Sequence, residues 1–332
     1  MALGSVLFFG DINVDNILAV NEIPDPGRDT YANHIEMHLG GAACNSGVIL
    51  QGLGHPASLF GLVGDDLWAD FVFSELSSYG VNFTNVIKKS TGKTGVIFIA
   101  VTPNGERTMF SYRGINSNIE PDDIPPRILD GVQLIQFSGY AFIESPQKET
   151  AWKLLKMAKD QDIPICMDTG LDPVILKPDL IQEVLPFLTL LITARKEALI
   201  LAGCREYGSQ VDFFLSHGLQ QVGIKMGEKG ALLGHSGGFE QMPAFPVKVV
   251  DTTSAGDAFS TGMIYGYMHN FSHKECLVLA NALGGMATMV YGAAKINRPD
   301  LLRFLLEVSC YGMAQVYQEV ITDVAQRIEG SM

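Results

Sequence analysis

The sequence contains few basic residues and no basic run, which limits the partners it can bind. Among 332 residues it carries 23 Lys and Arg against 36 Asp and Glu, for a formal net charge of −13. No run of Lys or Arg is longer than two residues. Because binding to the phosphate backbone of a nucleic acid needs a basic stripe, we expect no nucleic-acid partner.

Cysteine is scarce too, and the five cysteines show no metal or disulfide pattern. No C-x-x-C pair occurs, and no His stands beside them at metal-ligand spacing. Buried thiols in a reducing, cytoplasmic compartment are therefore predicted. These residues are Cys44, Cys166, Cys204, Cys276 and Cys310.

Long hydrophobic runs and a signal peptide are lacking as well. The first five residues lead directly into a strand-like run and a polar turn, without a basic segment and a long apolar core. The most apolar stretch, residues 276–294, contains Asn281, three glycines and a Thr. This composition favours a core helix over a membrane span, so we expect no membrane partner.

What the sequence does contain is the alternation of strand-like and helix-like runs that is typical of an α/β domain. Residues 6–9 are all apolar, as in a parallel strand buried on both faces. From residue 134 onward the alternation implies parallel βαβ units. With 47% hydrophobic residues, one domain over residues 1–332 is predicted. Such sheets bind ligands beyond the carboxyl ends of their strands, where Asp168 and Lys225 fall.

Two segments, at about residues 15–39 and 94–113, interrupt this alternation. The second contains two strand-like runs around Pro103-Asn104-Gly105, which is a strong hairpin signal. Together the two segments are predicted to form a small sheet that stands off the main domain. Further along, residues 247–250 are expected to form a strand, and the segment from about Cys310 onward a helix docked on the surface.

The turn at residues 251–257, with the sequence Asp-Thr-Thr-Ser-Ala-Gly-Asp, leads into an apolar, helix-periodic run. Ser254, Ala255 and Gly256 are small enough for the backbone to approach a ligand closely. The first N–H groups of a helix lack partners and carry partial positive charge, so this turn can cradle phosphate oxygens. Asp257 would repel such an anion unless it accepts a proton from the hydroxyl that attacks the phosphorus. The alternative is that Asp257 only caps the helix.

A second small-residue helix start, Gly40-Gly41-Ala42-Ala43-Cys44-Asn45, lies far upstream. Together with residues 251–257 it resembles the two signatures of the ribokinase-like (PfkB) carbohydrate kinases, and the resemblance covers residues 6–294 or so. The segments Gly10-x-x-Asn13-x-Asp15, Gly64-Asp65-Asp66 and 225–230 add to it. It implies a three-layer α/β/α domain with a mostly parallel sheet, a small β-sheet lid, and ATP-dependent phosphorylation of a sugar hydroxymethyl.

The resemblance also implies roles for individual residues. The catalytic base would be Asp257, and the anion hole would be the backbone of Ser254, Ala255 and Gly256. Sugar contacts are implied for Asn13, Asp15, Gly40, Gly41 and Asn45. Nucleotide contacts are implied for Lys225, Gly227, Gly230, Thr252 and Asn281. A Mg²⁺ ion would be held by Glu197 through water, since Mg²⁺ keeps several of its waters.

Each polar side chain in these sets has an alternative role without a ligand. Asp15 could end its strand in solvent, Asn45 could cap its helix, and Lys225 could be solvated. Glu197 could be an exposed helix residue. Asn281 could make a hydrogen bond inside its helix.

Two departures from the family pattern concern the ions. Ala194 replaces the Asn of the family's Asn-x-x-Glu motif, which weakens the assignment of Mg²⁺ to Glu197. Relatives often bind a monovalent cation through carbonyls such as those of Asp251 and Thr253. Residues 292–297 match the second loop of that site poorly, so activation by K⁺ is left open.

The lid offers one indication of the substrate. Arg107 and Arg113 are six residues apart, hence on one face if the strand persists, and Tyr112-Arg113 resembles a pair in 2-keto-3-deoxygluconate kinases. Arg113 could pair bidentately with a carboxylate or phosphate of the substrate, or it could be an exposed lid arginine. A sugar or a sugar acid therefore fits the pattern, and the sequence names neither the sugar nor the hydroxyl.

Two rival functions remain open. A nucleoside kinase of the same superfamily would pack a purine against lid aromatics such as Phe98, Phe110 and Tyr112. A catalytically silent sugar-binding regulatory protein would show no sugar-dependent turnover of ATP. Because the lids of this family often pair between subunits, the resemblance also implies a homodimer through the exposed small sheet.

Overall fold

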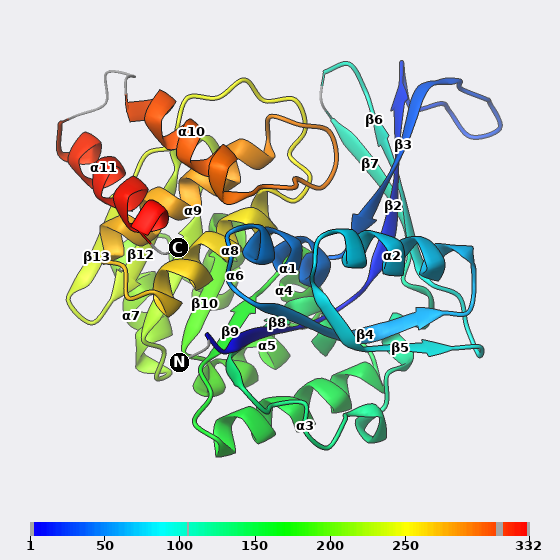
Figure 1. Ribbon diagram of the computed structural model, residues 1–332, viewed down its shortest axis with the longest axis horizontal. Coiled ribbons are helices and arrows are strands. Elements are labelled where there is room, and N and C mark those ends of the chain that lie inside the picture. The colour runs from blue at the N-terminus through cyan, green and yellow to red at the C-terminus, as the bar shows by residue number, and fades with distance from the viewer. Residues whose placement is uncertain (1–2, 105, 310–314, 331–332) are drawn as a thin grey trace.

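The larger of two sheets forms the centre of the molecule (Figure 1). A computed structural model describes residues 3–104, 106–309 and 315–330. Within them the sheet has nine strands in the order β13-β12-β11-β10-β9-β8-β1-β4-β5, and only β12 and β13 run antiparallel to their neighbours. The strands are β1 (Ser5–Phe9), β4 (Ala57–Gly64), β5 (Asn82–Lys89), β8 (Val132–Ser138), β9 (Ile165–Asp168), β10 (Leu190–Ala194), β11 (Gln221–Lys225), β12 (Ala231–His235) and β13 (Gly238–Met242).

Helices cover both faces of this sheet, which confirms the predicted three layers (Figure 1). One face carries α1 (Ala42–Gly52), α2 (Leu67–Ser78), α8 (Ala255–Met268), α9 (His273–Ala287), α10 (Arg298–Ser309) and α11 (Gln315–Gly330). The other carries α3 (Gln147–Asp160), α4 (Leu171–Leu176), α5 (Pro178–Val184), α6 (Arg195–Ala202) and α7 (Tyr207–Ser216). Short 3₁₀ turns are η1 (Gly114–Asn118), η2 (Pro121–Asp123), η3 (Gly139–Phe142), η4 (Leu185–Phe187) and η5 (Gly227–Lys229).

The all-apolar sequence of β1 follows from its position between the two helical layers. Side chains of a strand alternate between its faces, so Val6 and Phe8 pack under the first helical layer while Leu7 and Phe9 pack under the second. All four are fully buried or nearly so. Burying each such side chain contributes about 1.5–3 kcal/mol, so the strand stabilises both cores at once.

The smaller sheet is the predicted lid, and it stands off the main sheet (Figure 1). Its order is β3-β2-β6-β7, with β2 parallel to β6 and the other two pairs antiparallel. The strands are β2 (Asn13–Val20), β3 (Ala32–Gly40), β6 (Gly95–Val101) and β7 (Arg107–Tyr112). Asp15 is in register with His38 and Ile97, so these side chains share one face, and the next row, around Phe98, occupies the opposite face.

Some expectations differ from the structure. Residues 247–250 form no strand, because no neighbouring strand pairs with them and their apolar side chains border a cleft instead. Strands β5 and β13 were not predicted. The predicted C-terminal helix is confirmed over Gln315–Gly330, where it packs against α9 and α10. Gly105 and Cys310 lie outside the described residues.

The described cysteines and helices bear on two further expectations. Cys44, Cys166 and Cys276 are buried free thiols, and Cys204 is a free thiol of intermediate exposure. No described helix has the length and apolar character that crossing a bilayer would need.

Candidate active site

Helix α8 begins at the carboxyl edge of the sheet with free backbone donors. The residue before it, Ser254, has a left-handed backbone with φ of 56°, and Ala258 N donates to the Ser254 carbonyl at 2.9 Å. In the described chain the N–H groups of Gly256 and Asp257 have no backbone acceptor, and Ala255 N reaches only Thr252 O, at 3.4 Å. The turn therefore presents unpaired donors where the helix dipole is positive.

Asp257 lies in that first turn and joins the two small-residue helix starts. Asn45 Nδ2, from the first turn of α1, donates to Asp257 Oδ2 at 2.7 Å across 212 residues of sequence. Burial raises the pKa of Asp257 to about 6; the hydrogen bond from Asn45 opposes this shift, and the charge of Asp168 adds to it. A carboxylate with a pKa near 6 is ionised at neutral pH and still basic enough to take a proton in a reaction.

Asp15 is a second carboxylate close to Asp257, on the lid side. Its side chain is 4% exposed, and Oδ1 has no hydrogen-bond partner among the described residues. Burial raises the pKa of Asp15 to about 7, and the negative charge of Asp257 acts in the same direction. A Cβ atom on Gly40 would lie 2.2 Å from Asp15 Oδ1, so only glycine leaves room for this carboxylate. An unsatisfied buried acceptor is costly unless a ligand donates to it.

Asn13 and Gly41 complete the part of the site that is predicted to bind the sugar, here called the acceptor side because the sugar would accept the phosphoryl group. Asn116 Nδ2 donates to Asn13 Oδ1 at 2.9 Å and, by the same amide, to Ile12 O at 3.1 Å. These bonds orient the Asn13 amide so that its oxygen is occupied and its NH₂ group remains available to donate to a ligand. Gly41 has φ of 92°, and a Cβ there would lie 2.2 Å from Asp11 O. A glycine pair is therefore required between β3 and α1.

Arg113 and Arg107 do not share a strand face, contrary to the expectation, because β7 ends at Tyr112. The Arg113 guanidinium binds both oxygens of Asp11, at 2.7 and 2.9 Å, and also Gln147 Oε1 at 2.7 Å. It is thus engaged by the protein rather than exposed. Arg107 instead reaches the loop before α8, where Nη1 donates to Thr253 Oγ1 at 3.0 Å.

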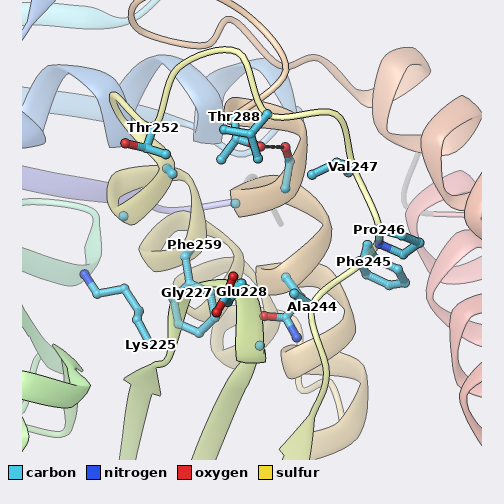
Figure 2. Close-up of a pocket in the computed structure, with 17 residues that line it drawn as sticks. Lys225, Gly227, Glu228, Ala244, Phe245, Pro246, Val247, Thr252, Phe259 and Thr288 are labelled. Carbon is cyan, nitrogen blue, oxygen red and sulfur yellow. Dashed lines mark hydrogen bonds between the residues drawn. The ribbon is translucent and has the colours of Figure 1, made fainter. Parts of the chain in front are cut away.

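A cleft of about 750 Å³ adjoins the start of α8 on the other side. All five predicted nucleotide contacts line it, together with Ala255 and Gly256. In Figure 2, Lys225 and Thr252 lie at one end of the cleft and Phe245 and Pro246 at the other. Its volume is in the range of small-molecule and cofactor sites. The predicted contacts are Lys225, Gly227, Gly230, Thr252 and Asn281.

Two side chains that border this cleft are fixed by the protein. Lys225 Nζ binds both oxygens of Asp168, at 2.8 and 2.9 Å, and Ser260 Oγ donates to the same carboxylate at 2.6 Å. Although burial alone would lower the pKa of Lys225, the charges of Asp168 and Glu197 raise it, so the amine is protonated. Asn281 Nδ2 donates to Pro243 O at 3.1 Å, a contact to the chain after β13 and not within its own helix.

The model of the pfkB family carbohydrate kinases matches residues 4–300 of this chain. That match spans the two helix starts, the lid and the cleft. The chain belongs to this family. It is therefore a phosphotransferase that acts on an alcohol group.

Similar proteins include kinases of several sugars and sugar derivatives. An ATP-dependent ribose-1-phosphate kinase of Halopiger xanaduensis is 28% identical over 302 residues, which cover 91% of this chain and 97% of that protein. A ribokinase of Staphylococcus aureus is 26% identical over 260 residues, covering 76% and 83%.

Solved structures of this kinase family share the fold. The ribokinase of Thermotoga maritima superposes with a TM-score of 0.79 at 22% identity, covering 92% of this chain and all of the other. The ribokinase of Arabidopsis thaliana complexed with ribose and ATP gives 0.78 at 22% identity, covering 91% and 99%. The adenosine kinase of Sinorhizobium meliloti gives 0.79 at 22% identity, covering 88% and 96%.

Kinases of the pfkB family use ATP and Mg²⁺, and one carboxylate of this pfkB kinase fits such an ion. Glu197 is 6% exposed rather than a surface residue, and its Oε2 accepts from Thr169 Oγ1 at 2.6 Å and Ala194 N at 2.8 Å. No described residue donates to Oε1, which could therefore accept from a metal-bound water. Within the described residues no cluster of three or more His, Cys, Asp or Glu side chains could hold a metal alone.

The candidate site also contains residues that the sequence did not identify. Asn116 orients Asn13 over 103 residues of sequence, and Arg113 is held by Asp11 over 102 residues and by Gln147 over 34. Asp11 and Asn116 follow the ends of β1 and β7, and this position is the one signal that could have indicated them. Activation by K⁺ stays a prediction. The Asp251 carboxylate accepts from Thr253 N and Gly292 N, so the protein fixes its side chain.

Proposed function

We propose that this kinase transfers the γ-phosphoryl group of ATP to a hydroxymethyl group of an uncharged sugar, with Asp257 as the base. The observation that carries the proposal is the position of Asp257 between two ligand sites. Its own helix start lines the cleft of about 750 Å³. On the other side, the buried carboxylate of Asp15 lies close enough that the charge of Asp257 adds to the rise in the pKa of Asp15.

The proposed reaction is an in-line displacement at phosphorus. The sugar hydroxyl oxygen bonds to the γ-phosphorus, the bond to the bridging oxygen breaks, and ADP leaves with the electron pair. The hydroxyl proton passes to Asp257, whose pKa of about 6 suits a base at neutral pH. The N–H groups of Ala255 and Gly256 stabilise the charge that develops on the transferred group. When bound, Mg²⁺ would neutralise phosphate charge, with Glu197 orienting its water.

The charges around the acceptor favour a neutral sugar over a sugar acid. Arg113 was the candidate partner for a substrate carboxylate, but it already binds both oxygens of Asp11, and Nη1 lies 3.2 Å from Glu144. An acidic substrate would have to displace these carboxylates and approach Asp15 and Asp257. Sugar hydroxyls, in contrast, can donate to the free oxygen of Asp15.

The aromatic side chains that a nucleoside kinase would stack on the purine do not face the acceptor side. Phe98 and Phe110 are in register with each other, one residue out of phase with Asp15. They therefore lie on the lid face opposite to Asp15, and they are 45% and 63% exposed. A purine on the acceptor side would meet Ile97 and Ser111 instead. Phosphorylation of adenosine but not of free sugars would decide for a nucleoside kinase.

A homodimer through the lid is part of the proposal. The lid face away from Asp15 exposes Ile35, Met37, Phe98, Phe110 and Tyr112, each between 42% and 63%. An exposed apolar face of this kind is typical of a protein–protein interface. A second copy of the chain presents the same face, so the two faces can pair. Sedimentation should show a dimer at micromolar concentration, and Phe110→Asp should give monomers. A wild-type monomer would contradict this part.

A panel assay tests the function itself. ATP consumption would be followed with ribose, fructose, 2-keto-3-deoxygluconate, fructose phosphates and nucleosides as acceptors. We expect a neutral sugar to give the highest kcat/KM. Preference for 2-keto-3-deoxygluconate or a sugar phosphate would overturn the charge argument. No ATP turnover with any of these acceptors would favour the catalytically silent regulatory protein.

A further inference from the structure

Arg107 connects the lid to the loop that precedes the anion hole. It is the first residue of β7, in register with Val101 and Ala19, and so lies on the same lid face as Asp15. Its Nη1 donates to Thr253 Oγ1 at 3.0 Å and lies 4.0 Å from Asp251 Oδ1. A side chain of the lid thus bonds directly to the segment that leads into α8.

The loop that Arg107 contacts is organised around one buried carboxylate. The Asp251 side chain is fully buried; Oδ1 accepts from Thr253 N and Thr253 Oγ1, both at 2.9 Å, and Oδ2 accepts from Gly292 N at 2.9 Å. Since the Thr253 hydroxyl proton is used on Asp251, its oxygen is free to accept from Arg107. Among the described residues, Arg107 is the cation that lies within ion-pair distance of Asp251.

A shift of Thr253 would move the backbone of the anion hole, because Ser254, Ala255 and Gly256 follow it directly in the chain. The next residue, Ser254, has the left-handed φ of 56°, which is unfavourable for a residue other than glycine and needs support from its surroundings. Ser254 Oγ accepts from Ala294 N at 3.0 Å on one side, and Thr253 anchors it on the other. The N–H groups of Ala255 and Gly256 follow immediately, so their direction depends on this anchor.

We propose that Arg107 is a positioning residue that couples lid closure to the geometry of the anion hole. When the lid covers the acceptor, Arg107 holds Thr253 and Asp251, and Ser254 keeps the backbone that aims the N–H groups of Ala255 and Gly256 at the transferred group. When the lid opens, this support is lost and the hole is less well formed. The coupling would restrict phosphoryl transfer to an enzyme with its acceptor enclosed; it rests on the proposed kinase function.

The kinetic test uses Arg107→Ala, Arg107→Lys, Thr253→Val and the double variant Arg107→Ala with Thr253→Val. The acceptor is the one that gives the highest kcat/KM in the panel, with MgATP. We expect Arg107→Ala and Thr253→Val each to lower kcat about tenfold or more while both KM values change less than about twofold. The double variant should be no slower than the slower single variant, and Arg107→Lys should recover part of kcat.

A matched control and a second measurement separate this role from others. Arg28, exposed in the connection between β2 and β3 of the same lid, should tolerate Arg28→Ala without a change in kcat. Hydrogen exchange over residues 251–260, measured with the non-hydrolysable ATP analogue AMP-PNP and no acceptor, should be several-fold faster in Arg107→Ala than in the wild type.

The results that would overturn the coupling are specific. Additive losses in the double variant, a raised acceptor KM with unchanged kcat, or a lower melting temperature with unchanged kcat and exchange would each contradict it. A wild-type enzyme that phosphorylates nothing in the panel would refute the proposed function, and the exchange measurement would then still decide whether Arg107 supports the loop.

Discussion

The nucleotide side and the acceptor side of this site are lined by different kinds of chemical group. The nucleotide cleft is lined largely by glycines and apolar side chains, and two of the polar side chains that line it, Lys225 and Asn281, already have protein partners. The acceptor side is formed by buried polar groups, and Asp15 keeps an oxygen without any partner in the described structure. Lys225 and Asn281 are therefore paired without a ligand, whereas Asp15 is not fully paired.

This difference indicates where substrate choice lies. Because the Lys225 and Asn281 side chains keep their protein partners when no ligand is bound, this wall of the cleft can be retained across kinases with different acceptors. Buried carboxylates with raised pKa values, such as Asp15 and Asp257, lower stability until a ligand donates hydrogen bonds to them. Changes on the two sides should therefore affect different kinetic constants, and Asp257, where the sides meet, should affect turnover.

The largest effect is expected at this meeting point. Asp257→Asn keeps the size of the side chain and an oxygen that can accept from Asn45, but it removes the base. We expect kcat to fall by at least about a hundredfold with little change in either KM, measured by coupled detection of ADP. Asp212→Asn, at an exposed position of α7, is the control and should be silent. Turnover close to normal would refute the assignment of the base.

Much of this division could be predicted from sequence, because it depends on local pattern. The apolar run of β1, the strand–helix alternation and the small-residue turns at Gly40 and Ser254 each carry a local signal, and the structure brings the two turns together through Asn45 and Asp257. The lid segments were likewise marked by their interruption of the alternation.

The rest could not be predicted because it depends on contacts between distant residues. The partners of Arg113 are set by where β7 ends, and the ends of strands are weakly encoded. Residues 247–250 have the apolar character of a strand, but a cleft uses the same residue types. Glu197 is buried through hydrogen bonds to Thr169 and Ala194, which its position on an amphipathic helix does not reveal.

The next largest effect should be confined to the acceptor side. Gly40→Ala places a Cβ atom 2.2 Å from Asp15 Oδ1, so the carboxylate or the strand has to move. We expect the acceptor KM to rise about tenfold or more, equivalent to about 1.4 kcal/mol, while the KM for ATP is unchanged. Gly208→Ala, where a Cβ would meet nothing within 4 Å, is the control. An equal rise in both KM values would show that the two sides are not independent.

A smaller effect concerns stability and its dependence on pH. The pKa of Asp15 is raised from 3.8 to about 7 in the folded state, so between these values the unfolded chain releases a proton that the folded chain retains. Stability contributed by this group therefore falls as pH rises, by at most about 1.4 kcal/mol per pH unit. Because an amide does not titrate, the ligand-free Asp15→Asn variant should gain stability over the wild type between pH 5 and pH 8.

Urea unfolding of both proteins at several pH values measures this difference. The free energy of unfolding of the variant, relative to the wild type, should increase with pH and level off above about pH 7. A difference that stays constant with pH would mean that Asp15 is ionised in the folded protein as it is in the unfolded chain, and that the acceptor side is less strained than the structure indicates.

The smallest effect is the counterpart of Gly40→Ala on the nucleotide side. Asn281 Nδ2 donates to Met242 O at 3.4 Å and Pro243 O at 3.1 Å, which ties α9 to the chain that forms one wall of the cleft. Asn281→Ala removes these bonds at a net cost of about 0.5–1.5 kcal/mol. We expect the KM for ATP to rise between about twofold and tenfold and the acceptor KM to stay the same. If the acceptor KM rose instead, the cleft wall would have to act on the lid, and the separation of the two sides would fail where it is expected to be clearest.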